Sequence, residues 1–582
     1  MRQILVAGML TGLSFAASAQ QPSMSWNPDR DTNYINPVIN ADYSDPDVCR
    51  VGDDFYMTSS SFGCFPGLQI LHSTDLVNWE IIGAALTDYP GPGWSDERQW
   101  ETLGQRLDTP DTPPPGPQEW RTVPQHGNGV WAPAIRYHNG EFYIYCGDPD
   151  RGIFMVKTSD PRGRWEDPVW VVKAKGFIDP CPLWDEDGKA YLSHGCAGSR
   201  AGLKSVLFVA PMSPDGTRLL GPSRIVYDGH ETQPTIEGTK FYKYNGDYYI
   251  FSPAGGVSTG WQVVLKSSSP WGPYQERIVM AQGNSSVNGP HQGAWIDTPS
   301  GEHWFMHFQD KDAYGRVVHL QPMIWTAEGW PVIGVDKDGN GVGEPVMKYK
   351  KPALRNSGIF QPAENDSFTD IELGLQWQWH GVPSPYWYYV DADARETATN
   401  GLGALRLYSV DQAEDWRNLG DSPNLLLQKT PADEFTVTAK LHFMPNPQLK
   451  ERGENCGFVL MGQDYATVRL TDTPEGIVLQ YIECKDAFKG DSEQVKQSIP
   501  MKSADVFVKM EVKPKERKGN VPDLTARFFY SLDAKKWTEL TDKPFTGSAG
   551  KWIGAKFGLY CNRFASKNDS GWVQIDWIKV TK

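Results

Sequence analysis

The segment "ADYSDPDVCRVGDDFYMTSSSF", Ala41 to Phe62, places an Asp-Pro pair directly before a strand-like run of alternating residues. Its centre, "VGDDFYMTSS", contains a glycine turn at Gly52 followed by aromatic and apolar residues, and this phrase recurs along the chain. The repeats are "NGEFYIYCG" at Gly140, "DGKAYLSHG" at Gly188, "NGDYYIFSP" at Gly246 and "SGEHWFMHF" at Gly301. Asn-Gly or Asp-Gly between apolar runs is the strongest short-range signal of a β-hairpin. The repeat therefore predicts five hairpins.

The spacing of these glycines predicts the architecture. Successive glycines stand 88, 48, 58 and 55 residues apart, and each interval is long enough for a four-stranded sheet with its loops. We therefore predict an all-β fold in which residues 20–350 form a five-bladed β-propeller. The long first interval contains a Pro/Gly-rich insertion, residues 89–120, which is predicted to be a loop over one face.

The pattern changes after residues 351–364, a Pro-containing stretch that we interpret as a linker. Short alternating strands such as "EFTVTAKLHFM", "CGFVLMGQ" and "VFVKMEV" follow, separated by turns. This pattern predicts an antiparallel β-sandwich over residues 365–582. Trp377, Trp379 and Trp387 could serve its core or form a sugar-binding platform.

Composition excludes several classes of partner. The chain has 582 residues and a formal net charge of -15, so it offers no basic surface for nucleic acid. Residues 1–19 have the form of a cleaved secretory signal peptide, with an Ala-x-Ala site at 17–19, and this predicts a secreted or periplasmic protein. No later apolar run is long enough to span a bilayer, so no membrane insertion is expected. The eight cysteines have no C-x-x-C spacing, and buried free thiols are favoured over disulfides.

Acidic residues occur at matched positions in different repeats. Seven to ten residues before the repeated glycine, the five segments contain Asp45-Pro46, Trp131 to Pro133, Asp179-Pro180, Glu237-Gly238 and His291. A single Asp-Pro is better read as a common turn opener. Repetition at the same phase instead predicts that three carboxylates and a histidine surround one central hollow, at the start of the innermost strands. Carboxylates around one pocket are the groups that glycoside hydrolysis requires.

The same residues resemble a known family. "SDPDVCRVGDDFYM", "WAPAIRYHNGEFYI", "FIDPCPLWDEDGKAYL" and "IEGTKFYKYNGDYYIF" are similar to the blade motifs of glycoside hydrolase family 43. These enzymes are five-bladed propellers that cleave α-L-arabinofuranosyl and β-D-xylosyl linkages with inversion. The resemblance, from about Asn36 to Val346, implies that Asp45 is the general base, Glu237 the general acid and Asp179 the group that tunes the acid.

Further positions concern substrate and metal binding. "AYGRVVHLQPMIW" resembles the family stretch whose arginine contacts the sugar, which implies Arg316 as a ligand, with a structural salt bridge as the alternative. His291 matches a family position that helps to hold a metal ion in some members, and a packed, hydrogen-bonded histidine is the alternative. Phe62, Phe65 and Trp131 are candidate walls for stacking a sugar ring.

Three further stretches bear on substrate, metal binding and the second domain. "WAPAIR" has alanine where relatives often have a polar or acidic residue, so the sugar preference stays open. "DKDGNGVGE", Asp336 to Glu344, begins like a calcium loop, but its twelfth position is Met347, so a surface turn is predicted. The stretch from "DSFTDIELGLQWQW" to "DSGWVQIDWIKV" resembles the concanavalin-like domain of family 43 enzymes, which packs on the propeller and either helps to close the pocket or binds carbohydrate independently.

The resulting hypothesis is an exo-acting inverting glycosidase that releases terminal α-L-arabinofuranose, or β-D-xylose, from plant hemicellulose or pectin oligosaccharides. α-L-Arabinofuranosidase is favoured by a small margin, and a β-xylosidase proper is the first alternative. A non-catalytic glycan-binding propeller would dispense with a carboxylate, whereas all three are present. A retaining fructan-type hydrolase would carry a W-x-N-D-P-N-G-like motif where this chain has Asp-Pro-Asp-Val. No organic cofactor is predicted, and Ca²⁺ is an optional ligand.

Overall fold

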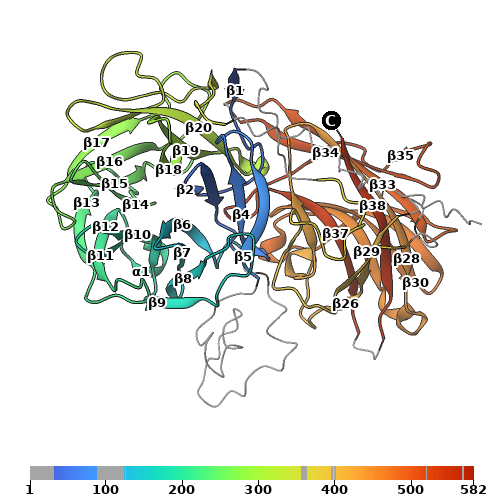
Figure 1. The fold of residues 1–582 in the computed structure, drawn as a ribbon. Coiled ribbons are helices and arrows are strands. Elements are labelled where there is room, and N and C mark those ends of the chain that lie inside the picture. The colour runs from blue at the N-terminus through green and yellow to red at the C-terminus, as the bar shows by residue number, and fades with distance from the viewer. Residues whose placement is uncertain are drawn as a thin grey trace, which may run out of the picture.

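The computed structural model describes residues 32–87, 124, 126–355, 364–394, 398, 402–519, 521–565 and 569–581. Five four-stranded sheets surround one axis, and a second domain made of two larger sheets lies beside them (Figure 1). The predicted all-β fold, a five-bladed propeller followed by a β-sandwich, is confirmed. The predicted signal peptide and the predicted insertion lie outside the described residues. Within the described ranges, no helix has the length and apolar character needed to cross a membrane.

Each blade is an antiparallel sheet whose four strands follow chain order. Blade 1 comprises β2 (Asp47–Val51), β3 (Asp54–Thr58), β4 (Gly67–Ser73) and β5 (Glu80–Leu86). Blade 2 comprises β6 (Trp131–His138), β7 (Glu141–Asp148), β8 (Gly152–Thr158) and β9 (Val169–Lys173). Blade 3 comprises β10 (Phe177–Trp184), β11 (Ala190–Cys196), β12 (Val206–Met212) and β13 (Arg224–Asp228). Blade 4 comprises β14 (Lys240–Tyr244), β15 (Asp247–Ala254), β16 (Trp261–Ser267) and β17 (Gln275–Met280). Blade 5 comprises β18 (His291–Asp297), β19 (His303–Asp310), β20 (Arg316–Trp325) and β21 (Pro331–Ile333).

The first strand of each blade lies nearest the axis (Figure 1). These strands contact one another in series, from β18 through β2, β6 and β10 to β14. The five repeated glycines lie in the turns between first and second strands, with φ between 64° and 87°. A residue with a Cβ adopts this left-handed backbone only at a cost, which explains the repeated glycine.

The ring is closed by pairing between its two ends. Strand β1 (Asn33–Ile35) is antiparallel to β22 (Lys348–Lys350). Beside it, the Tyr34 hydroxyl donates to the Leu320 carbonyl over 2.8 Å. The buried Asn36 amide also donates to that carbonyl, and its oxygen accepts from the Leu320 N–H. The N-terminal segment therefore packs on blade 5 and holds the ring of blades closed.

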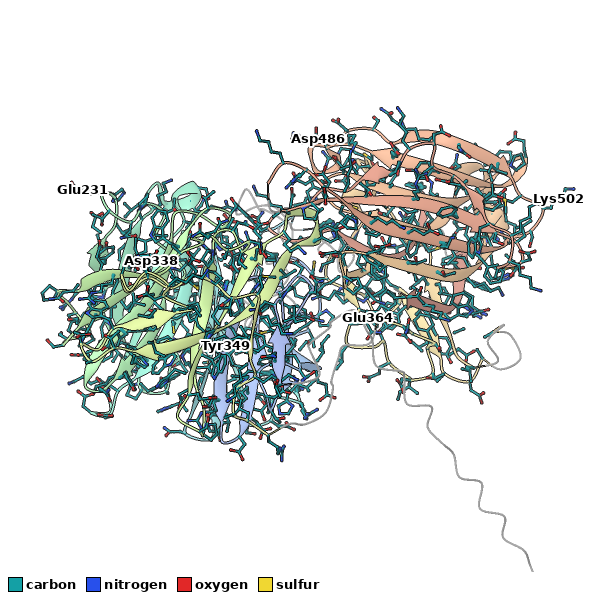
Figure 2. The ribbon with its side chains drawn as sticks, turned by 90° about the horizontal axis from the view of Figure 1, so that it is seen from above. Glu231, Asp338, Tyr349, Glu364, Asp486 and Lys502 are labelled. Carbon is teal, nitrogen blue, oxygen red and sulfur yellow. The ribbon has the colours of Figure 1, made fainter. Side chains whose placement is uncertain are left out.

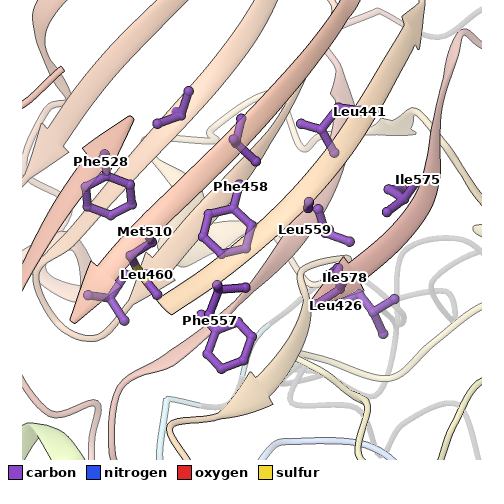
Figure 3. Close-up of a cluster of buried hydrophobic side chains, with 14 of the residues drawn as sticks. Leu426, Leu441, Phe458, Leu460, Met510, Phe528, Phe557, Leu559, Ile575 and Ile578 are labelled. Carbon is purple, nitrogen blue, oxygen red and sulfur yellow. The ribbon is translucent and has the colours of Figure 1, made fainter. Parts of the chain in front are cut away.

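The second domain is a sandwich of two sheets. One has the order β23 (Gln378–Trp379), β27 (Leu426–Lys429), β37 (Lys556–Arg563), β29 (Asn455–Met461), β30 (Tyr465–Thr473), β31 (Gly476–Cys484) and β32 (Gln494–Pro500), with β26 (Val410–Asp411) parallel to β37. The other has the order β24 (Tyr388–Asp391), β25 (Ala404–Tyr408), β38 (Trp572–Thr581), β28 (Phe435–Met444), β33 (Asp505–Lys515), β34 (Asp523–Ser531) and β35 (Thr538–Glu539), with β36 (Phe545–Thr546) beside β34. Apolar side chains from both sheets interdigitate between them (Figure 3). Trp377, Trp379 and Trp387 are buried in this core, which favours the core alternative over a sugar platform.

The described helices are short. They are α1 (Gly198–Ala201) and the 3₁₀ turns η3 (Asp312–Tyr314), η4 (Leu419–Asp421), η5 (Pro447–Arg452) and η6 (Ala487–Lys489). All eight cysteines are buried free thiols, as favoured from the sequence.

The two domains are joined by specific contacts. Figure 2 shows them side by side, with Glu231 and Asp338 on the propeller and Asp486 and Lys502 on the sandwich. Backbone N–H and carbonyl groups of Phe65 and Trp379 pair across the junction. The carboxylate of Asp42 accepts from the Arg316 N–H of blade 5 and from the Gly554 N–H of the sandwich. The sandwich is therefore held against the face of the propeller that carries Asp42.

Candidate active site

One cavity of about 110 Å³ opens at the axis of the propeller. It is lined by Asp45, Phe62, Trp131, Ala132, Ile178, Asp179, Glu237, Val257, His291, Gln292, Arg316 and Trp552. The structure thus brings together every candidate site residue predicted from the sequence except Phe65. Phe65 is fully buried, packs between blades 1 and 2 and bonds to Trp379, so it does not face the cavity.

A recurrent backbone irregularity directs side chains into this cavity. At the start of the innermost strands, Asp45, Ala132, Asp179, Gly238 and Gln292 all have positive φ, between 30° and 66°. Pairing of the first and second strands shifts register at these points in blades 2, 3 and 5, as in a β-bulge. Bulges re-aim side chains near active sites, and non-glycine residues adopt positive φ only where the surroundings compensate the strain. The equivalence of the five positions, predicted from the sequence, is therefore visible in the backbone.

The Asp45 carboxylate is held on one side and open on the other. Its Oδ2 accepts hydrogen bonds from the hydroxyls of Ser44 (2.8 Å) and Ser60 (2.5 Å). Its Oδ1 lies 3.7 Å from Nη1 of Arg316. Ser60 in turn accepts from the Ala132 N–H of blade 2. The two hydroxyls fix the orientation of the carboxylate and leave Oδ1 directed to the cavity, where it can accept a proton from water.

Asp179 and Glu237 are neighbouring carboxyl groups that also line the cavity. Oδ2 of Asp179 accepts from the Gly238 N–H over 2.7 Å, so it contacts the backbone directly after Glu237. Burial raises the pKa of Asp179 well above its ordinary value, and the neighbouring charge of Glu237 adds to that shift. Asp179 therefore retains its proton beyond the usual pH range of an aspartate. The Glu237 side chain is about one-third exposed and reaches the mouth of the cavity, so it can deliver a proton to a ligand.

Arg316 and His291 both come from blade 5 and also line the cavity. The Arg316 guanidinium donates to the Ser44 hydroxyl over 2.7 Å, and Ser44 in turn donates to the Asp45 carboxylate. His291 is almost fully buried, and its Nε2 lies 3.2 Å from Oε1 of Glu237. Its Nδ1 has no hydrogen-bond partner within the described part of the chain. His291 thus positions Glu237, while Arg316 supports Asp45 and faces the cavity.

Below the cavity, a charged hub of Asp47, Arg136, Cys181 and Lys240 joins the first strands of blades 1 to 4. Asp47 Oδ2 accepts from Arg136 Nη1 over 2.6 Å, and Arg136 Nη2 donates to Cys181 Sγ over 2.9 Å. The Lys240 ammonium is completely buried, 3.8 Å from Asp47 Oδ1, and donates to the Pro133 carbonyl. Three hub members follow Asp45, Asp179 and Glu237 by two or three residues. The hub therefore sets the spacing between the strands that carry the three carboxylates.

Trp552 is one of four cavity residues that sequence reasoning missed, with Ile178, Val257 and Gln292. It lies in the loop before β37 of the sandwich, and its ring is 6.3 Å from that of Trp131, at 75°. The N–H groups of Gly554 and Ala555 bond to Asp42 and to the Ala313 carbonyl of the propeller, which fixes this loop. One tryptophan among 23, more than 200 residues beyond the blades, carries no local sequence signal for this role.

The residues present do not fit a calcium site. Across the ranges that the structure describes, no three His, Cys, Asp or Glu side chains converge as metal ligands. At the cavity His291 would offer a single nitrogen, whereas Ca²⁺ takes six to eight oxygen ligands. In the "DKDGNGVGE" turn, the Asp336 carboxylate accepts backbone N–H groups of residues 338 to 341, so its oxygens are occupied as in a surface turn.

Three carboxyl groups in a small aromatic-walled cavity at a propeller axis define a glycoside hydrolase. The chain belongs to glycosyl hydrolases family 43, whose family model matches residues 34–331. A second model, the beta xylosidase C-terminal concanavalin A-like domain, matches residues 365–581. The resemblance stated from the blade motifs is confirmed for both domains.

Curated relatives carry two kinds of name. A putative beta-xylosidase of Xylanibacter ruminicola is 42% identical over 417 residues, which cover 72% of this chain and 70% of the relative. A beta-xylosidase of Formosa agariphila is 30% identical, with 96% of this chain and 92% of the relative covered. A non-reducing end alpha-L-arabinofuranosidase of Bacteroides ovatus is 31% identical, with 74% of each chain covered. The GH43 protein BlXynB of Bacillus licheniformis has the same fold, with a TM-score of 0.73 at 23% identity over 94% of this chain and 99% of that one.

Proposed function

We propose that this glycoside hydrolase removes one terminal pentose, β-D-xylose or α-L-arabinofuranose, from plant xylan-type or pectic oligosaccharides outside the cytoplasm, with inversion at the anomeric carbon. The observation that carries the proposal is the cavity itself. Its volume of about 110 Å³ suits a single sugar ring, and walls from both domains surround it. A pocket of this kind binds a chain end rather than a chain interior, so the action is exo.

The proposed mechanism uses the three carboxyl groups in one displacement. Asp45 Oδ1 accepts a proton from a water molecule, and the water oxygen attacks the anomeric carbon. Glu237, at the mouth, donates its proton to the departing glycosidic oxygen as the bond to the anomeric carbon breaks. Asp179 and His291 hold Glu237 in position, and Arg316 binds the sugar beside Asp45. Phe62 and Trp131 supply apolar surfaces on which C–H faces of the ring pack.

The names of the relatives support both sugars. Two of the three relatives above are called β-xylosidases and one an α-L-arabinofuranosidase. The two pentoses present similar hydroxyl patterns to one pocket, so one site can accept both.

Parallel hydrolysis of an aryl β-D-xylopyranoside and an aryl α-L-arabinofuranoside tests the proposal, with Asp45→Asn as the blank. We expect wild-type protein to release the aryl alcohol from at least one substrate and the variant to release it from neither. Absence of turnover on both by folded wild-type protein would contradict the proposed function.

A further inference from the structure

A lysine of the sandwich contacts the segment that precedes Asp45. The Lys429 ammonium, at the end of β27, lies 3.3 Å from the centroid of the Tyr43 ring, which is almost fully buried. The ammonium also donates to the side-chain oxygen of Gln69 on β4 over 2.8 Å. The Gln69 amide in turn donates to the Leu375 carbonyl of the sandwich over 2.8 Å. Lys429 therefore joins blade 1 and the Tyr43 segment to the second domain.

The contact reaches the proposed base along a short path of covalent and hydrogen bonds. Tyr43 stands two residues before Asp45, and its N–H donates to the Arg316 carbonyl over 2.9 Å. Ser44, between them, accepts from the Arg316 guanidinium and donates to the Asp45 carboxylate. On the other side of Tyr43, the Asp42 carboxylate accepts from the Arg316 N–H over 2.8 Å. A shift of the Tyr43 ring therefore moves the backbone that sets the positions of Ser44 and Asp45.

The Lys429 ammonium has no acidic partner. Among the residues that the structure describes, no carboxylate forms an ion pair with it. Burial, and after it the charge of Lys556, lowers the pKa of Lys429 well below its ordinary value. A desolvated ammonium is costly unless its surroundings compensate for the lost hydration. The compensation here comes from the Gln69 oxygen and from the face of the Tyr43 ring, which attracts a cation most strongly where water is excluded. The ammonium and the ring therefore hold each other in place.

From these contacts we infer that Lys429 is a positioning residue for the proposed base. By holding Tyr43, it keeps the Asp45 carboxylate in the orientation from which that carboxylate activates water. The inference rests on the proposed function, because it concerns the same reaction. Stability alone would favour an apolar residue at position 429, since a desolvated charge without an ionic partner is costly. The cation is therefore explained by what it positions rather than by the stability of the domain interface.

The test compares Lys429→Met with Lys556→Met. We expect Lys429→Met to lower kcat on the aryl glycosides about tenfold, with a smaller change in KM, because a small displacement of a reacting group has effects of this order. The loss should be equal for nitrophenyl and phenyl leaving groups, since the base acts on water in both cases. Displacement of the acid, Glu237, would instead spare the activated nitrophenyl substrate. Lys556 is the matched control, a neighbouring buried lysine whose ammonium donates to Gln378 of the sandwich over 3.0 Å, and its variant should keep the wild-type kcat.

Further variants connect the effect to the Tyr43 ring. Lys429→Arg keeps a cation over the ring and should retain most of the wild-type kcat. In a Tyr43→Leu background, which lacks the ring, Lys429→Met should cause little further loss, because the effects of two residues that act through one contact are not additive. Lys429→Gln keeps a polar group beside Gln69 but no charge. It should behave like Lys429→Met, and it serves the same test if Lys429→Met does not fold.

Thermal melting confirms that each variant is folded, and kcat is compared below the lowest melting temperature of the set. Three results would each overturn the inference: an unchanged kcat in the folded Lys429 variants that lack the charge, an equal loss in Lys556→Met, or an undiminished effect of Lys429→Met in the Tyr43→Leu background. Failure of the proposed function is distinguishable, because wild-type protein would then turn over neither aryl glycoside.

Discussion

The propeller has buried charged groups at its centre, whereas the sandwich has an apolar core. The sandwich has one large apolar core between its sheets, with residues such as Phe458, Phe557 and Phe528 (Figure 3). The propeller instead divides its apolar side chains among separate clusters between neighbouring blades. Its axis holds the charged hub and the catalytic cavity. The difference indicates that the sandwich is held by apolar burial, whereas the positions of the three carboxyl groups proposed to be catalytic depend on buried charge pairs.

The largest effect is expected from Asp45→Asn at the propeller axis. The amide cannot accept the proton of the attacking water, so we expect kcat on both aryl glycosides to fall by about 10³-fold or more. Because Ser44 and Ser60 can still bond to the amide oxygen, the melting temperature should change little. A variant that retains more than a tenth of wild-type kcat would show that Asp45 is not the base.

Asp47→Asn disturbs the charged hub of the propeller, and Phe458→Ala disturbs the apolar core of the sandwich. Breaking a buried charge pair and truncating a core phenylalanine each cost about 3–5 kcal/mol of unfolding free energy. Only Asp47→Asn should also lower kcat of the molecules that remain folded, because the hub spaces the strands that carry the carboxylates. Denaturant unfolding and kcat at low temperature, corrected for the folded fraction, separate these effects. Equal kcat values in the two variants would refute the hub's positioning role.

Trp552→Ala tests how far the sandwich takes part in the propeller's chemistry. The change removes one wall of the catalytic cavity and a hydrophobic contact for the sugar, so we expect KM to rise about tenfold with a smaller change in kcat. Lys502→Ala, on the sandwich and distant from the propeller, serves as the control (Figure 2). An unchanged KM would show that Trp552 of the sandwich does not contribute to substrate binding.

The smallest effect is a change of pH dependence in Asp179→Asn. The raised pKa of Asp179 means that its contribution to stability is complete below its unfolded value, about 4, and is lost as pH rises through the folded value. The asparagine variant should therefore lose less melting temperature than wild type as pH increases. The pH profile of kcat/KM should also change, because asparagine has no proton to lose at the position beside Glu237 where Asp179 titrates. Coincident stability profiles for both proteins would show that the pKa of Asp179 is not raised in the folded protein.

Much of this arrangement was predictable because the blades repeat. The glycine turns fix the hairpins, and residues at one phase of each repeat, such as Asp45 and Asp179, must then meet at the axis. Phe65 shares the aromatic character of Phe62 three residues away, but local sequence does not tell which ring faces the cavity and which packs between blades. Trp552 was unpredictable for a different reason. Its role depends on how the sandwich docks through Asp42 and Gly554, a contact between residues over 500 positions apart.

The configuration of the first product tests the role of Asp45 as general base most directly. It can be followed by ¹H NMR during hydrolysis of an aryl β-D-xylopyranoside, or of the arabinofuranoside if only that substrate is cleaved. With Asp45 activating water opposite the departing oxygen, we expect the inverted anomer, α-D-xylose or β-L-arabinose, to appear first, before mutarotation mixes the forms. Initial release of the anomer that retains the substrate's configuration would contradict it.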